Sequence, residues 1–136
     1  MSELFISVVI ISHNSEGIFQ CITALKRQLN NNDEIIIVDD HSEIVFQKNL
    51  HAFCKKNNIN IVHPEEKGNR AYNRNLGAKN ARNPILVFVD ADIILSDKSI
   101  YSIRRAHTYR EEIAFIGTRY CARYDPYRMF LFVTAQ

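Results

Sequence analysis

The sequence predicts an α/β fold, with an open and mostly parallel sheet and helices on both faces. Short, nearly continuous apolar runs rich in Val and Ile alternate strictly with longer stretches whose apolar residues recur at helical spacing. Strict alternation of strands and helices is typical of parallel sheets, because each connection crosses over through a helix. The length of 136 residues and the 46% hydrophobic content fit one globular domain.

The predicted elements follow one another without a linker between them. The expected strands are 5–12, 34–38, 59–62, 85–89 and 113–116. The first helix is expected to begin at Ser15 as its N-cap and to end at the three asparagines 30–32. The later helices are marked by Phe46, Leu50 and Phe53, by the stretch 69–81, and by Ile100, Ile103 and His107 after a cap at Ser96 or Asp97.

Composition excludes several classes of protein. The net charge of +2 gives no strong overall field, and we expect no nucleic-acid partner, because the basic residues of 67–82 are interleaved with only one aromatic residue, Tyr72. No stretch reaches the roughly 18 apolar residues of a transmembrane helix, and the amino-terminal residues read as a strand rather than a signal peptide. Three scattered cysteines, Cys21, Cys54 and Cys121, indicate buried reduced thiols. We therefore expect a cytoplasmic protein, or one at the inner membrane surface.

Two carboxylates one residue apart, Asp90 and Asp92, follow the buried strand 85–89. Carboxylates at a strand end repel each other and lose solvation, which a hard divalent cation compensates. Mg²⁺ or Mn²⁺ prefers such oxygen ligands, with phosphates and water completing its shell. We therefore expect Asp92 to ligate a metal ion and Asp90 to orient a ligand. Strand-ending and turn-forming roles are the alternative for both residues.

A second carboxylate pair, Asp39 and Asp40, ends the strand 34–38, and a basic helix follows later in the chain. Asp39 and Asp40 are expected either to accept an N–H from a ligand or to form a turn. Arg70 and Arg74 lie one turn apart on one face of the expected helix. A guanidinium can pair with a base edge or a phosphate through two parallel hydrogen bonds. Because ligands bind beyond the carboxyl ends of strands in open sheets, these groups are expected to share one rim.

Other reaction classes lack their signatures. No nucleophile elbow, P-loop or GxGxxG motif is present. A phosphoacceptor receiver domain is one alternative. It requires acidic residues at the end of the first strand and a lone aspartate at the end of the third strand. Here the first strand ends in Ser12-His13-Asn14, and the third in His63-Pro64.

Four motifs in order resemble family 2 of the glycosyltransferases, the inverting enzymes with a GT-A fold. The resemblance runs from about residue 5 to residue 95, and more loosely to 117. In that family a strand ends near Tyr-Asn, and VDD-x-S, ARN-x-G and DxD follow. This sequence has His13-Asn14, Val38-Asp39-Asp40-His41-Ser42, Asn73-Arg74-Asn75-Leu76-Gly77 and Asp90-Ala91-Asp92, with His and Asn replacing the usual Tyr and Ala.

The resemblance implies a UDP- or GDP-sugar donor and a hexosyltransferase-type enzyme of polysaccharide biosynthesis. It implies that Asp40 binds the base, that Arg74 contacts the base or the diphosphate and that Asp90 faces the ribose. Ser12 and His13 would line the base pocket. Asp92 would hold Mg²⁺ or Mn²⁺ against the diphosphate.

The same resemblance implies that residues 1–136 are the nucleotide-sugar-binding, Rossmann-like half of a longer domain, truncated before the acceptor-binding part. The general base is expected beyond residue 136, because Asp125 is the only carboxylate after residue 117 and belongs to an Asp-Pro turn. The acceptor, a saccharide or lipid-linked group, is unspecified. The apolar stretch 129–133 is expected to be covered by missing structure, a partner or a second copy. A non-catalytic nucleotide-sugar-binding module is the alternative function.

Overall fold

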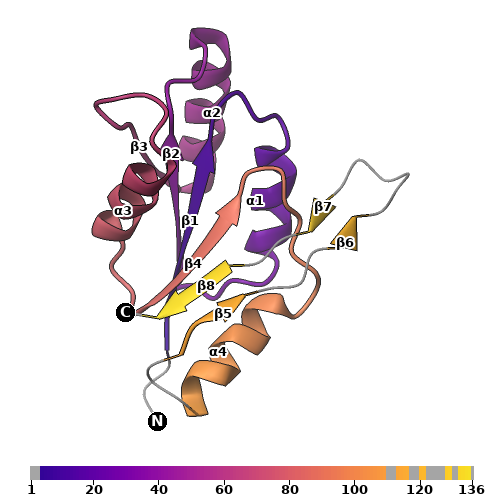
Figure 1. Ribbon diagram of the computed structural model, residues 1–136. Helices are drawn as coiled ribbons and strands as arrows, with labels where there is room; N and C mark the ends of the chain where they lie inside the picture. The colour runs from indigo at the N-terminus through magenta and orange to yellow at the C-terminus, as the bar shows by residue number, and fades with distance from the viewer. Residues whose placement is uncertain (1–3, 110–112, 117–119, 122–127, 130–131, 136) are drawn as a thin grey trace.

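The computed structural model describes residues 4–109, 113–116, 120–121, 128–129 and 132–135 (Figure 1). Strands and helices alternate through the first 109 residues, as the sequence predicts. The strands are β1 (Ile6–Ser12), β2 (Glu34–Asp39), β3 (Asn60–Val62), β4 (Ile85–Asp90), β5 (Phe115–Ile116), β6 (Tyr120–Cys121), β7 (Arg128–Met129) and β8 (Phe132–Ala135). The helices are α1 (Ile18–Lys26), α2 (Ile44–Asn57), α3 (Arg70–Asn80) and α4 (Ser99–Tyr109).

Four parallel strands form the centre of the main sheet, in the order β3-β2-β1-β4. Their carboxyl ends meet at one edge, which lies at the top in Figure 1. Beyond β4 the order continues with β8 and then β5, and β8 runs antiparallel to both neighbours. The mostly parallel sheet is therefore confirmed. The strand expected at 113–116 is shorter and pairs with β8 rather than with β4, because β8 takes the place next to β4.

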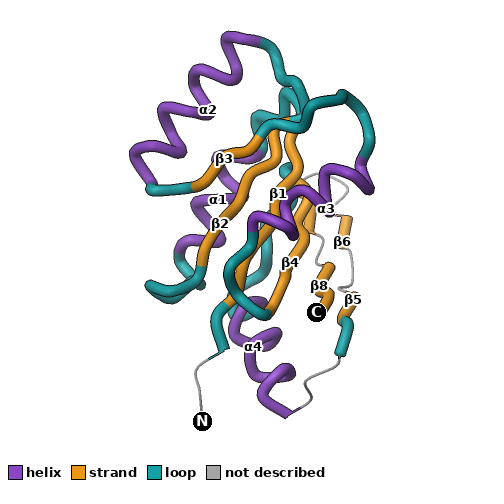
Figure 2. Tube along the Cα trace, turned by 90° about the vertical axis from the view of Figure 1, so that its left-hand side faces the viewer, coloured by secondary structure: helices purple, strands orange, loops and turns teal. Residues whose placement is uncertain are grey.

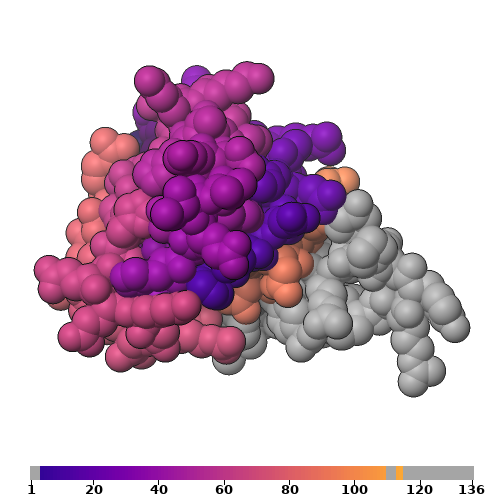
Figure 3. All heavy atoms as spheres, turned by 90° about the horizontal axis from the view of Figure 1, so that it is seen from above, coloured from indigo at the N-terminus to yellow at the C-terminus, as the bar shows by residue number. Residues whose placement is uncertain are grey.

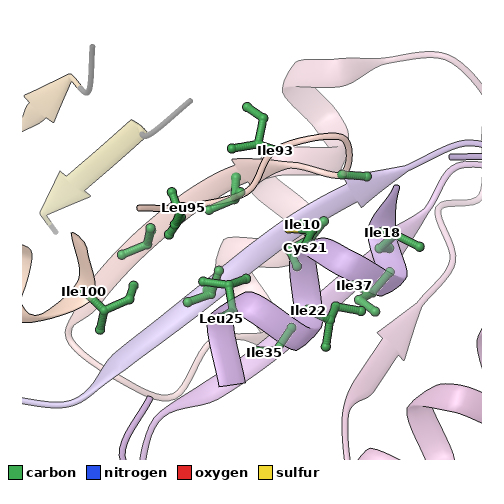
Figure 4. Close-up of a cluster of buried hydrophobic side chains, with 14 of the residues drawn as sticks. Ile10, Ile18, Cys21, Ile22, Leu25, Ile35, Ile37, Ile93, Leu95 and Ile100 are labelled. Atoms are coloured by element: carbon green, nitrogen blue, oxygen red, sulfur yellow. The ribbon is translucent and has the colours of Figure 1, made fainter. Parts of the chain in front are cut away.

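Among the described helices, three cover one face of the sheet and one covers the other. Alternate residues of β1, β2 and β4 join α1, α2 and α4 in a single buried cluster (Figure 4). In that cluster Ile10, Ile22 and Ile100 are completely buried. Burial of these strands on both faces explains the continuous apolar runs in the sequence, because a strand with one exposed face would alternate apolar and polar residues.

Helix α3 packs on the opposite face, over β1 and β2. Figures 1 and 2 show it across the sheet from α1. Gly77 makes this contact possible, since a Cβ atom at that position would lie 2.2 Å from Val9 Cγ1 and 3.3 Å from Val38 Cγ2. Asn69 caps the helix by accepting the Tyr72 N–H at 2.9 Å, so the predicted bounds of this helix are confirmed to within one residue at each end.

Helix α1 is shorter than the sequence predicts at both ends. Its N-cap is Gly17 rather than Ser15, and no side chain caps it. The carbonyl of Ser15 instead accepts the Ile18 N–H at 3.2 Å. At the other end Arg27 is the C-cap, so the helix stops before the three asparagines. The Asp33 carboxylate accepts the Asn30 N–H at 2.7 Å, which holds the chain in a loop there.

The remaining sequence predictions divide between confirmed and untested. Ile100, Ile103 and His107 are buried on α4, which begins at Ser99 after the predicted caps. Cys21 and Cys54 are buried free thiols, as predicted. The Cys121 side chain and residues 130–131 lie outside the described part, so the expected cover over 129–133 stays a prediction. None of the described helices has the length and apolar character needed to span a membrane.

Candidate functional site

A hollow of about 290 Å³ opens at the carboxyl edge of the parallel strands. Seen from above, segments that follow different strands meet on this face (Figure 3). The hollow is lined by Ile11, Ser12, His13, Ser15, Asp40, Arg70, Arg74, Asp90, Ala91 and Asp92. All six residues that the sequence nominates therefore lie around one cavity, although they come from three strand ends and one helix.

Asp40 lies at the end of β2 with its carboxylate held by the backbone of a later loop. The Gly68 N–H donates to both carboxylate oxygens at 3.0 Å, and His41 Nδ1 lies 3.4 Å from one of them. Gly68 has φ +89°, a conformation that side-chain-bearing residues rarely adopt. Burial by itself would raise the pKa of Asp40, but the Gly68 N–H and His41 outweigh it and lower that pKa. The side chain is thus an anion with acceptor sites left for a ligand.

The neighbouring Asp39 has a different environment, although the sequence presents the two as a pair. Asp39 is completely buried and accepts a 2.5 Å hydrogen bond from Ser42 Oγ. It does not line the hollow. Alternation of side chains along an extended strand explains why one carboxylate faces the protein and the next faces the cavity.

The end of β1 is held in place by the end of β2. His13 Nδ1 lies 2.8 Å from the Asp40 carbonyl oxygen. The Asn14 N–H donates to Ser42 Oγ at 2.8 Å, and Asn14 Oδ1 accepts the Glu43 N–H at 2.8 Å. Asn14 has φ +48°, which Asn tolerates better than most residues. These contacts explain why His13-Asn14 and the VDD-x-S segment occur together in the sequence.

Arg74 and Asp90 bring helix α3 and strand β4 together across the hollow. Arg74 Nη2 lies 3.3 Å from Asp90 Oδ1, and both side chains are partly exposed. A guanidinium has five donors, so this one contact leaves others directed elsewhere. The pair places a positive and a negative group side by side on the wall of the cavity.

Asp92 lies on the exposed rim, one turn beyond β4. Its carboxylate has no hydrogen bond or ion pair within the part of the chain that the structure describes. Burial, followed by the negative charges of Asp92 and Asp90, raises the pKa of the buried Cys21 thiol to about 12.

The donor set fits a hard divalent cation that a ligand helps to bind. No group of three or more His, Cys, Asp or Glu side chains gathers to hold a metal among the described residues. Mg²⁺ commonly binds through one or two carboxylates plus substrate phosphates, without an all-protein cage. Asp92, with Asp90 nearby, matches that arrangement in its chemistry.

Sequence reasoning gave one polar lining side chain a different role. Ser15 lines the cavity although it was expected to cap a helix. Arg70 lines it together with Arg74, as the spacing of the two on one helix face predicts. No signal marked Ser15, because its position depends on where α1 begins.

A larger hollow of about 720 Å³ lies at the opposite, amino-terminal edge of the sheet. Its lining is rich in asparagine, and its two carboxylates, Asp33 and Glu34, are already paired with Arg104 and Arg82. Because those charges are satisfied within the protein, the smaller hollow remains the candidate site despite its size.

Comparison with known proteins finds glycosyltransferases among the relatives of this chain. The chain is 28% identical to the glycosyltransferase GlyG of Streptococcus pneumoniae, and the match covers 100% of this chain and 46% of that protein. It is also 28% identical to YfnE of Bacillus subtilis, described as an uncharacterized glycosyltransferase, over 82% of this chain and 29% of that protein. The chain therefore spans less than half the length of these relatives.

Solved structures show the same fold at low sequence identity. TarS of S. aureus, residues 1–349 in complex with UDP-GlcNAc, matches with a TM-score of 0.69 and 21% identity, over 83% of this chain and 33% of that one. The mannosyltransferase PcManGT from Pyrobaculum calidifontis, in complex with GDP-Man and Mn²⁺, matches with a TM-score of 0.70 and 17% identity. The match covers 80% of this chain and 34% of that one. These matches establish the GT-A-type α/β fold. The family model described as glycosyl transferase family 2 matches residues 7–132, and the chain therefore belongs to that family.

Proposed function

We propose that this chain carries the donor site of an inverting, metal-assisted glycosyltransferase, which transfers a sugar from a nucleoside diphosphate to an acceptor hydroxyl. One observation carries the proposal: the six nominated side chains, distant in sequence, line one hollow at the carboxyl edge of the sheet. Ligands of open α/β sheets bind at this edge. GDP-Man in one structural neighbour and UDP-GlcNAc in another support a UDP- or GDP-linked donor.

Each residue has a role that its contacts allow. Asp40, held as an anion by Gly68, would accept an N–H of the base, with Ser12 and His13 beside it. Arg74 would exchange its Asp90 contact for the base or the diphosphate, which frees Asp90 for the ribose hydroxyls.

The leaving nucleoside diphosphate gains negative charge as the sugar departs. Asp92 would hold a divalent cation, which when bound would supply Lewis-acid stabilisation of that charge. The contribution of this chain is to hold the carboxylate at the rim and to orient the diphosphate with Arg74. The proposed general base lies beyond residue 136, in the part that sets the acceptor.

The size of the hollow defines how much of the donor it can hold. Ligand pockets range from about 300 to 1,000 Å³, so we infer that a hollow of about 290 Å³ holds only part of a nucleotide-sugar donor. We also propose that residues 1–136 form the donor half of a longer catalytic domain, in a cytoplasmic enzyme. A nucleotide-sugar-binding module without catalysis would use the same residues.

Calorimetric titration of the chain with UDP and with GDP, each with Mn²⁺ and again with EDTA, tests the proposal. We expect one nucleotide to bind with Mn²⁺ and to bind at least tenfold more weakly with EDTA. Equal affinity in both conditions would contradict the metal role. Absence of binding by both nucleotides, in this chain and in one extended past residue 136, would contradict the donor site.

The variant Asp92→Asn makes the metal role specific to one residue. We expect the affinity for nucleotide in Mn²⁺ to fall about tenfold, to the level measured in EDTA, because a neutral amide is a poor ligand for a hard cation. Asp97→Asn, an exposed aspartate outside the hollow, should retain the full Mn²⁺ response. Thermal unfolding should give the same midpoint for wild type and both variants, since Asp92 is exposed.

A further inference from the structure

Two histidines face each other on the surface, outside the candidate donor hollow. His51 belongs to α2 and His63 follows β3, and their Nε2 atoms lie 3.0 Å apart. Their rings are nearly parallel, at 20°, with centroids 5.1 Å apart. Both side chains are exposed to solvent. Neither residue lines the hollow at the carboxyl edge.

Behind this pair lies the buried carboxylate of Asp39. Asp39 is completely buried, and its Oδ2 atom has no hydrogen bond from any residue that the structure describes. His63 Nδ1 lies 3.5 Å from it. We assign the proton of His63 to Nδ1, because a buried carboxylate oxygen requires a donor. His63 Nε2 then presents a lone pair toward His51.

We propose that His51 and His63 bind a transition-metal ion such as Zn²⁺ through their Nε2 atoms, with Asp39 orienting His63 from behind. At Zn–N distances of about 2.0–2.1 Å, two tetrahedral nitrogen ligands lie about 3.3 Å apart. The observed 3.0 Å is within a few tenths of an ångström of that spacing. The ion takes the place of the proton that His51 otherwise shares with His63.

The buried carboxylate gives the pair a feature of known metal-binding histidines. A ligating imidazole usually donates its other N–H to a carboxylate or carbonyl, which fixes its tautomer and raises its basicity. Asp39 is positioned to do this for His63. Since no third His, Cys, Asp or Glu joins the pair among the described residues, solvent would complete the coordination shell.

This site differs in chemistry from the proposed donor-site metal. Imidazole nitrogen suits Zn²⁺, Cu²⁺ and Ni²⁺, whereas carboxylate and phosphate oxygens suit Mg²⁺ and Mn²⁺. The two ions are therefore expected to bind independently. The inference does not depend on the proposed function, because neither histidine touches the hollow.

The test is competition between the chain and a chromophoric Zn²⁺ chelator, in the absence of nucleotide. We expect one equivalent of Zn²⁺ to bind, and His51→Gln and His63→Gln each to weaken it at least tenfold. His41→Asn serves as the matched control, because His41 is an exposed histidine with φ +56°, which Asn tolerates. Zn²⁺ affinity in this control should equal that of the wild type.

Two further measurements identify the residues involved. NMR should show that Zn²⁺ shifts the ring signals of His51 and His63 but not those of His13 and His41. Asp39→Asn should weaken Zn²⁺ binding about tenfold, in line with losses of 10–100-fold for such supporting partners. Zn²⁺ binding that survives both His→Gln changes, or that shifts the signals of His13 and His41 instead, would overturn the proposal, as would the absence of stoichiometric binding.

Discussion

At the scale of single residues, two side chains of the same type can have opposite roles, because the backbone directs them to opposite sides of a strand. Asp39 and Asp40 are adjacent, yet one is buried against Ser42 and His63 and the other faces the candidate donor hollow. The contacts of Asp40 with Gly68 and His41 lower its pKa, after the opposing effect of burial. A buried carboxylate therefore stays ionised only where the stabilisation from nearby hydrogen-bond donors and positive charges exceeds the free-energy cost of desolvation.

Glu34 gives a pH-dependent prediction at this scale. Burial would raise its pKa, but the Ser7 hydroxyl and the Arg82 backbone and side chain outweigh burial and lower that pKa below its ordinary value of 4.5. Because the folded-state pKa is the lower one, the stabilisation is complete above pH 4.5 and is lost as the pH falls through the folded-state pKa. Glu34→Gln should lower the free energy of unfolding by about 1 kcal/mol at pH 7.

Urea unfolding of wild type and Glu34→Gln between pH 7 and pH 2 measures this difference. We expect the gap in free energy to narrow below pH 4.5 and to close once Glu34 is protonated in the folded protein. Glu65→Gln, an exposed glutamate, should match the wild type throughout. A gap that stays constant with pH would show that the charge of Glu34 contributes nothing.

The residue types at the site were accessible from the sequence, but their directions were not. Strand ends and motif order located Ser12, His13, Asp40, Arg74, Asp90 and Asp92, which the structure gathers around one hollow. Their binding roles stay predictions. The proximity of His51 and His63 was inaccessible, because it depends on how α2 packs beside β3, and no short motif records that packing.

At the scale of elements, helix α3 shows how one missing side chain sets the distance between a helix and a sheet. Gly77 faces Val9 and Val38, and its Cα lies too close to them to carry a Cβ. A closely packed helix keeps Arg74, one turn earlier, beside Asp90 at the edge of the sheet.

Gly77→Ala should therefore destabilise the protein, although alanine favours helices more than glycine does. Overpacking of a filled interior costs about 1–3 kcal/mol, whereas the gain in helix propensity is about 1 kcal/mol. We expect a net loss of up to about 2 kcal/mol, measured by urea unfolding. Asn75→Ala, an exposed substitution on the same helix, should be neutral or slightly stabilising. A stabilised Gly77→Ala would mean that α3 can move away from the sheet at little cost.

The elements themselves were largely predictable, and the exceptions have physical causes. Buried parallel strands and amphipathic helices leave strong periodic patterns, which located β1 to β4 and the helices between them. The ends of α1 differed, because loop contacts such as the Asn30 N–H to Asp33 end the helix early. The antiparallel β8 next to β4 was missed, because pairing between distant segments leaves no local pattern.

At the scale of the whole molecule, one ion pair joins segments far apart in the sequence. Arg104 of α4 pairs with Asp33 at 2.5 Å and also donates to the Leu4 carbonyl. Asp33 accepts the Ile6 N–H at 2.8 Å as well. The side chain of Asp33 is completely buried and that of Arg104 is 15% exposed. This cluster fastens α4 to the amino-terminal edge of the sheet.

Arg104→Met should lower the free energy of unfolding by about 3 kcal/mol, because it leaves the Asp33 carboxylate buried without its counter-charge. Arg105→Met, which removes the adjacent and fully exposed guanidinium, should leave the unfolding midpoint nearly unchanged. Adding Asp33→Asn to Arg104→Met should recover part of the lost free energy of unfolding. A double variant no more stable than Arg104→Met would show that packing rather than charge is responsible.

The position of β8 has a consequence for the order in which the protein is made. Every residue that lines the candidate donor hollow lies between Ile11 and Asp92, so the ribosome synthesises all of them before β8 at Phe132–Ala135. Until β8 arrives, β4 is an unpaired edge strand of apolar sequence, and such edges template association between chains. During translation the nascent chain thus exposes an edge prone to aggregation, and the interval lasts several seconds at about 5–20 residues per second.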